Sequence, residues 1–186
     1  MFAKYVVMKV NGKVVPYIVS PMEVTWDRLV DSEEVDMRKV LGAGFITWTE
    51  GNSDEITCFG EGFFHRSINS TRKTIRKSRG EEDAALFKEL LSKPLGYVVL
   101  NLNGMHRPII VYPHDNHDDA VLRYQVYAHR HVVSAGMVDF GMTTGKKARC
   151  SGSFHFESKF NPLTAESKGA EDVKLMRKFF SQEYHA

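Results

Sequence analysis

The sequence predicts an α+β protein built from two tandem β-β-(α)-β-β-α modules, residues 1–92 and 95–186, related by internal duplication and packed about a pseudo-twofold axis. Three observations lead to this prediction. The chain aligns to itself at an offset of 92 residues, each copy opens with a hairpin pattern, and each copy closes with an amphipathic helical pattern. With 186 residues, of which 42% are hydrophobic and 26% charged, the composition is that of a globular protein with a real core.

The internal repeat is the strongest of these observations. Residues 5–21 align without a gap to residues 97–113, and nine of the 17 positions are identical. Chance would give about one identity in a segment of this length. A three-residue deletion then changes the offset to 89, and residues 78–86 align to residues 167–175. We interpret the chain as two copies of one module.

Each copy opens with a predicted β-hairpin. In the first copy two β-rich runs, 4–10 and 13–19, flank an Asn-Gly pair, which favours the positive φ angles of a tight hairpin turn. Pro16 and Pro108 interrupt the second strand of this hairpin in the two copies. Because proline has no N–H to donate to a neighbouring strand, these strands are expected to lie at a sheet edge or to carry a bulge.

Turn residues and periodicity predict the remaining elements. A polar connection that leans towards helix follows the hairpin, then a second hairpin, and then a helix that is acidic at its start and basic further on. We expect these elements at 23–38, at 41–49 with 55–63, and at 81–92 in the first copy, and at 115–123, at 131–140 with 147–154, and at 170–183 in the second. The terminal helix would cover one face of a four-stranded antiparallel sheet, which makes the fold class α+β.

The large aromatic residues and the cysteines are assigned to the core. The aromatic residues expected there are Trp26, Trp48, Phe63 and Phe64. Cys58 and Cys150 occupy one position of the repeat. We expect both to be free thiols, because a buried cysteine behaves as a small apolar residue and disulfides are rare in the cytosol.

Residues 65–79 form a basic segment without a single acid. Its positive residues are Arg66, Arg72, Lys73, Arg76, Lys77 and Arg79. Three interpretations stay open: a solvated surface loop, a contact for an acidic protein, and a phosphate contact for nucleic acid or a nucleotide. The net charge of the whole chain is only +2, so any such attraction is local. The aligned segment 157–168 carries two lysines and two glutamates, so the basic charge belongs to the first copy alone.

Histidines gather in the second copy, which holds seven of the eight. The weak candidates for a transition-metal site are His114, His117, His129 and His131. Their spacing matches no zinc motif and no cysteine joins them. We therefore expect surface or half-buried histidines and no metal.

No catalytic signature stands out. The sequence has no nucleophile elbow, no glycine loop of the phosphate-binding type and no carboxylate pair that recurs in both copies. This predicts a non-enzymatic protein without a cofactor. Neither a secretory signal nor an apolar run long enough to span a bilayer is visible, so a cytosolic protein without membrane contact is expected.

Three segments carry a resemblance to a known group of proteins. Residues 132–138, 58–62 and 78–86 are similar to short uncharacterised proteins of about 90 residues that bacteriophages and prophages encode. In that group the module usually occurs once. The resemblance implies a phage-type accessory protein in the cytosol of the host cell, and small accessory phage proteins often bind and block a host factor, including a defence system.

Together these observations favour a binding protein whose partner is a host protein. The alternative partner is nucleic acid or a nucleotide, held by the basic segment. We expect the binding surface to combine residues 65–79 with residues 114–119, and the chain to be a monomer of pseudo-dimeric architecture or a homodimer.

Overall fold

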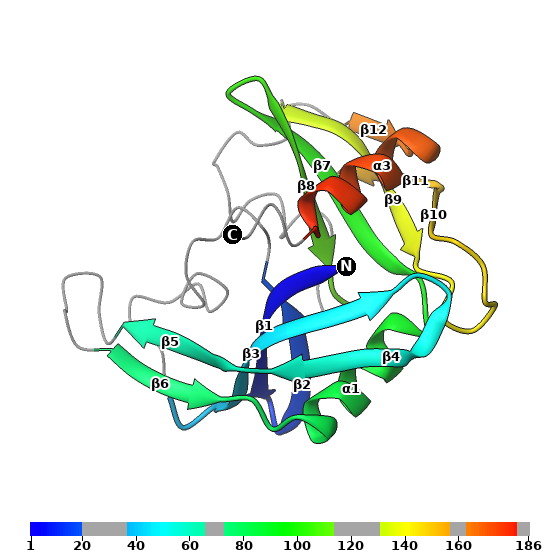
Figure 1. Cartoon of the computed structure of the whole chain (residues 1–186). Coiled ribbons are helices and arrows are strands. Elements are labelled where there is room, and N and C mark those ends of the chain that lie inside the picture. The colour runs from blue at the N-terminus through cyan, green and yellow to red at the C-terminus, as the bar shows by residue number, and fades with distance from the viewer. Residues whose placement is uncertain (20–36, 66–72, 114–130, 157–162, 182–186) are drawn as a thin grey trace.

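Antiparallel sheets dominate the structure, a computed structural model that describes residues 1–19, 37–65, 73–113, 131–156 and 163–181. Within these residues two four-stranded sheets, two two-stranded ribbons and two helices are present (Figure 1). The predicted class, α+β, agrees with this content. The predicted connecting helices at 23–38 and 115–123 lie outside the described residues, apart from two residues of a turn at the end of the first.

The first sheet contains β1 (Phe2–Val10), β2 (Lys13–Ile18), β3 (Val40–Thr49) and β4 (Asn52–Phe59), in the order β2-β1-β3-β4. All neighbours are antiparallel. Asn11 and Gly12 form the predicted turn between β1 and β2, with φ angles of 50° and 78°. Positive φ at both residues matches the twist of the two strands, which is why an Asn-Gly pair stands there.

The second sheet contains β7 (Leu95–Leu102), β8 (Met105–Val111), β9 (Val132–Asp139) and β10 (Arg149–Ser151), in the order β8-β7-β9-β10. Its strand order and its register both correspond to those of the first sheet at an offset of 92 residues. Tyr5 pairs with Ile18 and Gly44 in the first sheet, and Tyr97 pairs with Ile110 and Gly136 in the second.

Pro16 and Pro108 lie on β2 and β8, which are edge strands of their sheets. The sequence prediction for these two strands is therefore confirmed. Each proline lacks a backbone N–H. On an edge strand the position of this N–H can face away from the sheet, so no hydrogen bond between strands is lost.

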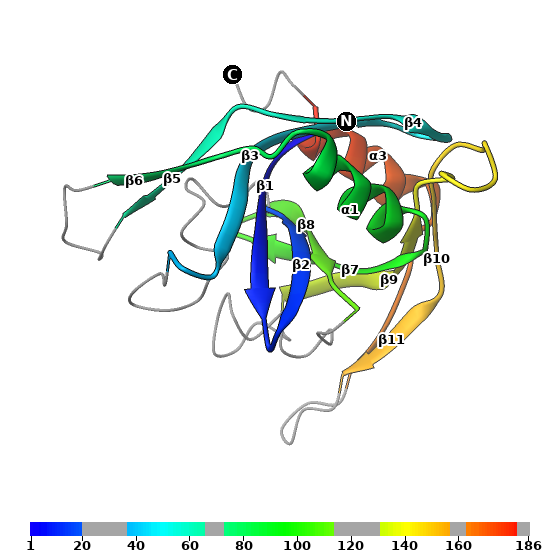
Figure 2. The same ribbon diagram turned by 90° about the horizontal axis from the view of Figure 1, so that it is seen from below.

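A two-stranded ribbon follows each sheet. The first consists of β5 (Glu61–His65) and β6 (Lys73–Lys77), and the second of β11 (Ser153–Phe156) and β12 (Leu163–Glu166). Figures 1 and 2 show both ribbons projecting from the body of the molecule. The sequence predicted one strand at 55–63 and irregular chain at 65–79. Gly60 instead divides the predicted strand, and part of the basic segment is strand β6.

The predicted terminal helices are α1 (Glu81–Leu91) and α3 (Ala170–Phe179). Helix α1 contacts the edge strands β2 and β4, and α3 contacts β8 and β10. Each helix therefore lies across the face of its own sheet. The acidic residues at the start and the basic residues at the end of each helix suit the direction of the helix dipole.

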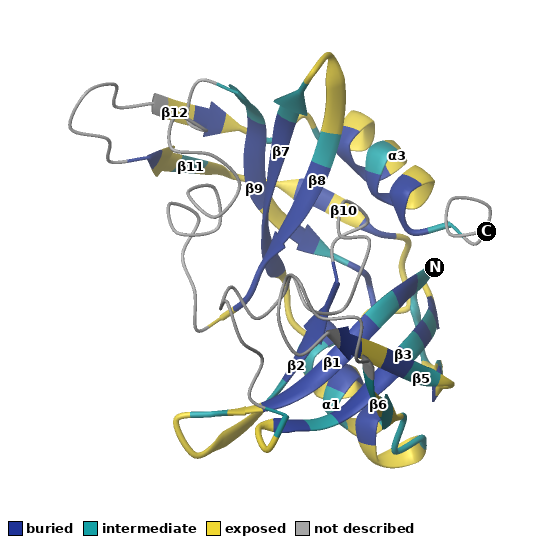
Figure 3. Ribbon diagram, turned by 90° about the vertical axis from the view of Figure 1, so that its left-hand side faces the viewer, coloured by how far each residue is buried: buried dark blue, intermediate teal, exposed yellow. Residues whose placement is uncertain are grey.

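Buried residues from both halves of the chain share one hydrophobic core. At its centre the ring of Trp48 lies 5.7 Å from that of Phe140 and 5.6 Å from that of Phe180. Tyr17 and Tyr112 contact edge to face at 5.0 Å. Figure 3 shows the buried strands of both sheets turned towards the middle of the molecule. Residues 1–92 and 95–186, called the first and second half from here on, are thus joined by packing as well as by the chain.

Candidate protein-binding surface

The β5–β6 ribbon of the first half positions the candidate site. Gly60 has a φ of 78°, a left-handed conformation that favours glycine and lets the chain leave the sheet after β4. The two strands then pair with Glu61 opposite Lys77 and Phe63 opposite Ile75. Because side chains alternate across a strand, these four residues belong to one face of the ribbon.

The other face of the ribbon is anchored to the body of the protein. Phe64 on β5 is fully buried. The guanidinium of Arg76 on β6 donates a hydrogen bond to the carbonyl oxygen of Met37 at 2.8 Å. These contacts fix the ribbon against the chain that leads into β3.

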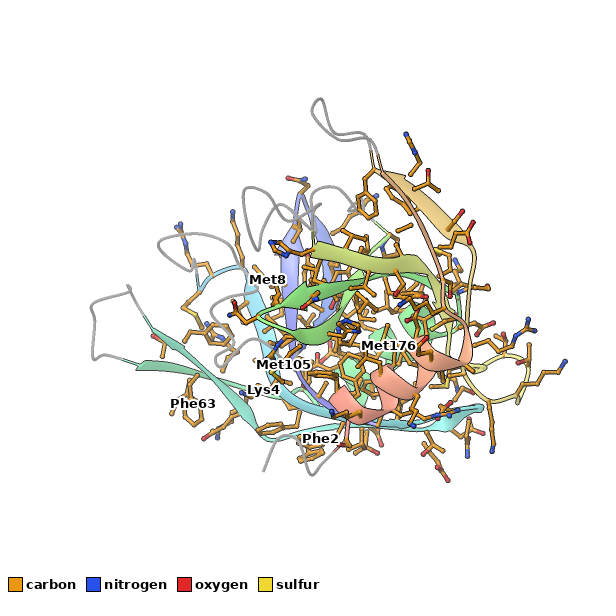
Figure 4. All side chains as sticks on the ribbon, turned by 90° about the horizontal axis from the view of Figure 1, so that it is seen from above. Phe2, Lys4, Met8, Phe63, Met105 and Met176 are labelled. Carbon is orange, nitrogen blue, oxygen red and sulfur yellow. The ribbon has the colours of Figure 1, made fainter. Side chains whose placement is uncertain are left out.

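The first face is exposed and partly apolar. Phe63 is 37% and Ile75 49% exposed, although the two are cross-strand partners. Lys77 is also exposed, and Glu61 opposite it is half-buried. Figure 4 shows Phe63 out on the ribbon, away from α3. We call Phe63, Ile75 and Lys77 the ribbon face. Exposed apolar side chains that gather in this way are typical of interaction surfaces.

Aromatic residues continue this apolar surface towards the first sheet. Phe59, the last residue of β4, is 44% exposed. Its ring centroid lies 6.0 Å from that of Phe45 and 6.5 Å from that of Phe2. Phe2 and Phe45 stack on each other at 5.4 Å. Three rings that support one another form a rigid edge beside the ribbon.

The second half carries polar residues at the corresponding positions. Offsets of 92 and 89 residues place Ser151, His155 and Thr164 where the first half has Phe59, Phe63 and Ile75. His155 and Thr164 are opposite each other on β11 and β12, and the distance between Nδ1 and Oγ1 is 2.7 Å. The same backbone therefore presents an apolar pair in one half and a hydrogen-bonded polar pair in the other.

The six basic residues predicted to bind a partner, Arg66, Arg72, Lys73, Arg76, Lys77 and Arg79, take different places. Arg66 and Arg72 lie outside the described residues. Lys73 begins β6 opposite His65. Arg76 belongs to the anchored face, and Arg79 forms an ion pair with Asp83 at 2.8 Å. Among the described residues, Lys77 is the predicted cation that the structure brings to the exposed face.

Arg79 belongs to a buried polar cluster at the start of α1. Asp83 is fully buried and accepts hydrogen bonds from the backbone N–H of Arg79 at 2.9 Å and from its Nε at 2.8 Å. The Tyr5 hydroxyl donates to the same carboxylate at 2.6 Å and lies 2.5 Å from the Ser78 hydroxyl. A buried carboxylate needs several such donors.

An equivalent cluster stands at the start of α3. Asp172 accepts hydrogen bonds from the Tyr97 hydroxyl at 2.5 Å, the Ser134 hydroxyl at 3.0 Å and the backbone N–H of Lys168 at 2.9 Å. Tyr97 also lies 2.6 Å from the Ser167 hydroxyl. Both clusters contain a tyrosine, a serine and an aspartate. The further side-chain donor to the aspartate is the Arg79 Nε in the first cluster and the Ser134 hydroxyl in the second.

Burial and these clusters change the acidity of the neighbouring groups. Burial raises the pKa of Cys58 to about 12, and the carboxyl of Asp83 adds to the effect. The pKa of Cys150 is raised to about 12 in the same way. Both cysteines are free and buried. Their thiols stay protonated near neutral pH and are poor nucleophiles.

The predicted histidine cluster falls mostly on residues that the structure does not describe. His114, His117 and His129 lie outside the described residues, and His131 stands directly before β9. Among the described residues, no group of three or more His, Cys, Asp and Glu side chains is arranged to hold a metal ion.

A groove of about 400 Å³ lies beside α3 in the second half. His106 and Val133 line it from the sheet, and Leu175 lines it from the helix. The charged residues around it are Lys168, Glu171, Asp172, Lys174 and Lys178. In the first half, Ala85 and Glu89 occupy the positions of Lys174 and Lys178, so the cationic rim belongs to the second half.

Comparison with known proteins gives no relative, because no family model, curated protein or solved structure matches the chain. None of the helices in the described part of the chain combines the length and apolar character needed to cross a membrane.

Sequence reasoning placed Phe63 in the core, and this was wrong. Phe63 follows Gly60, which turns the strand out of the sheet, so its side chain leaves the core while that of Phe64 stays in it. Ile75 was not singled out at all. Ile75 is the single apolar residue among the polar and basic ones at 73–77, a pattern that does not mark an exposed contact in the sequence.

Proposed function

We propose that this chain is a non-enzymatic accessory protein of the bacteriophage type that binds and modulates a host protein through the ribbon face. The observation that carries the proposal is the cross-strand pair of Phe63 and Ile75, which is apolar, exposed and held on a ribbon that projects from the body. Aromatic and aliphatic side chains at the centre of a surface are the usual anchors of protein–protein contacts.

The charge around this pair supports an acidic protein rather than nucleic acid as the partner. Phosphate binding would need several free cations. Of the predicted cations whose side chains the structure describes, Arg76 and Arg79 are engaged by the protein itself, and Lys77 stands opposite Glu61 on the ribbon face. Among these described side chains, an apolar centre with Lys77 beside it suits a partner that offers an apolar patch with a carboxylate at its rim.

The proposal includes the internal duplication and the pseudo-twofold axis. Trp48 and Phe140 are equivalent positions, 92 residues apart, and their rings contact each other. Equivalent residues meet in this way beside a twofold axis. The Phe2 N–H donates to the carbonyl of Phe180 at 2.8 Å, so the end of α3 meets the start of β1, just as residues 92–94 join α1 to β7.

Duplication gives the two halves different tasks. One copy diverges at an exposed surface while the other keeps the polar surface that a folded module needs. On this view the first half gained the apolar pair of Phe63 and Ile75 for binding the partner. The second half, with the polar pair of His155 and Thr164, does not contact the partner at this position. Inhibition of a host defence system is one form that such binding takes.

The test is affinity purification from a bacterial lysate with three forms of the chain. These are the wild type, the double variant Phe63→Ala and Ile75→Ala, and the matched control His155→Ala and Thr164→Ala. We expect the wild type and the control to capture the same protein, which mass spectrometry identifies, and the double variant to lose it. The purified partner should then bind the wild type directly in isothermal titration calorimetry. Equal capture by all three forms would overturn the proposal.

A nucleotide ligand is the second candidate, and the groove beside α3 favours it. Three lysines and two carboxylates surround an apolar floor, so that a lysine can meet the phosphate of a nucleotide while the floor holds its base. Under this alternative, mono- and dinucleotides raise the melting temperature of the wild type, and the variant Lys174→Ala with Lys178→Ala abolishes the rise. Equal melting temperatures with and without nucleotide would remove this alternative.

A further inference from the structure

In the β5–β6 ribbon, hydrogen-bonded and non-hydrogen-bonded residue pairs alternate, and this alternation determines which backbone N–H and C=O groups of β6 face outwards. The N–H of Ser78 donates to the carbonyl of Gly60 at 2.9 Å. The register continues from this hydrogen-bonded pair, and in an antiparallel ladder hydrogen-bonded and non-hydrogen-bonded pairs alternate. Ile75 and Lys77 therefore belong to non-hydrogen-bonded pairs, and their N–H and C=O groups point away from β5.

Among the described residues, β5 is the strand hydrogen-bonded to β6, and β3 contacts β6 without pairing with it. No backbone hydrogen bond within the described part of the chain uses the N–H or C=O of Ile75 or Lys77. Both side chains are exposed. An edge with free donors and acceptors is a template on which another extended chain can pair.

The equivalent edge in the second half is less suited to pairing with an acidic strand. Glu166 on β12 takes the place of Lys77, and Thr164 takes the place of Ile75. In the sequence Pro162 takes the place of Lys73. Proline and inward or flanking charges are the devices by which proteins discourage pairing at an edge. Among its described side chains, β6 carries one such device, the exposed Lys77, a charge that repels a basic strand and attracts an acidic one.

From this geometry we infer that an extended, acidic segment of the partner protein adds to β6 as a further strand. The inference rests on the proposed function and names how the partner is held. Main-chain hydrogen bonds to Ile75 and Lys77 supply the pairing, and the ribbon face supplies side-chain contacts. β6 has five residues and no acid, so it offers about 17 Å of edge to a strand with a carboxylate that meets Lys77.

The experiment selects peptides from a displayed library of random twelve-residue sequences on the immobilised full-length chain. Selected peptides are then measured by fluorescence polarisation against four variants. Lys77→Pro and Lys77→Ala both remove the charge, but only the proline removes the outward N–H. Phe63→Ala with Ile75→Ala removes the apolar pair of the ribbon face, and Glu166→Pro is the matched control in the second half. Circular dichroism checks that each variant is folded.

We expect acidic peptides with alternating apolar residues, bound about tenfold more weakly by Lys77→Pro than by Lys77→Ala, with an affinity that Glu166→Pro leaves unchanged. Amide hydrogen exchange at Ile75 and Lys77 should slow when the peptide binds. Equal affinity for Lys77→Pro and Lys77→Ala, with loss in the ribbon-face variant, would overturn strand addition but leave the proposed function standing. Failure to select peptides that need the ribbon face would overturn both.

Discussion

Replacing Tyr5 by phenylalanine tests whether the buried cluster at the start of α1 stabilises the fold. The substitution keeps the ring, which packs edge to face on Phe87 at 5.2 Å, and removes only the hydroxyl. That hydroxyl donates to the buried carboxylate of Asp83 and lies within hydrogen-bond distance of Ser78. The measured effect therefore reports these two interactions and not the packing of the ring.

The magnitude follows from the partners of the hydroxyl. A hydrogen bond to a charged acceptor contributes about 1.5 to 3 kcal/mol, and loss of the second contact adds to it. Asp83 keeps its contacts with Arg79, so it is not left without donors. We expect Tyr5→Phe to lower the free energy of unfolding by about 2 to 3 kcal/mol. For a chain of this length that corresponds to a fall in Tm of about 4 to 12 °C.

Urea denaturation followed by circular dichroism measures this change. Tyr97→Phe is the matched variant, because Tyr97 makes equivalent contacts with Asp172 and Ser167. The two variants should lose similar stability, within about 1 kcal/mol, and their effects should add because the clusters share no residue. A loss below about 0.5 kcal/mol for either variant would refute the view that these clusters hold each helix to its sheet.

Three further predictions concern pH and chain connectivity. The pKa values of Cys58 and Cys150 are raised in the folded protein, so these thiols ionise first in the unfolded state. Their contribution to the free energy of unfolding is therefore complete below about pH 9 and falls towards pH 12, by up to about 1.4 kcal/mol per pH unit for each thiol. If urea denaturation at alkaline pH gave the same slope for the double alanine variant as for the wild type, this prediction would be contradicted. The guanidinium of Arg177 on α3 lowers the pKa of the Glu50 carboxyl. This ion pair therefore stabilises the folded state above pH 4.5, and the stabilisation is lost as the pH falls. Glu50→Gln should therefore cost about 1 kcal/mol at pH 7 and progressively less as the pH falls below 4.5, whereas a cost that does not shrink with falling pH would exclude a charge effect. The end of α3 meets the start of β1 much as residues 92–94 join α1 to β7, so a circular permutant with new termini between Ser92 and Lys93 should fold with a native circular dichroism spectrum. An unfolded permutant would argue that these two junctions are not equivalent.

The parts of the fold that depend on local chemistry could be predicted from the sequence. An Asn-Gly pair determines the first turn of each half, and the dipole-matched charges of α1 and α3 mark both helices. Pro16 and Pro108 identify the edge strands, because a proline inside a sheet would break a hydrogen bond.

The candidate site could not be predicted in the same way. Strand β6 has a single apolar residue among five, and its basic residues resemble those of a solvated loop. The exposure of Phe63 depends on the bend at Gly60, a conformation that the sequence allows but does not require. Asp83 appeared to be one of three acids at a helix start, and only the packed structure brings Tyr5 to it.

Site-specific photo-crosslinking at the ribbon face tests the central claim most directly. A photoreactive benzoylphenylalanine replaces Phe63 in one form of the chain and His155 in the matched form. Both are irradiated in a bacterial lysate, and adducts are separated by gel electrophoresis and identified by mass spectrometry. We expect one discrete adduct with a host protein from position 63 and none from position 155. No adduct at position 63, or the same adduct from both positions, would contradict binding through the ribbon face.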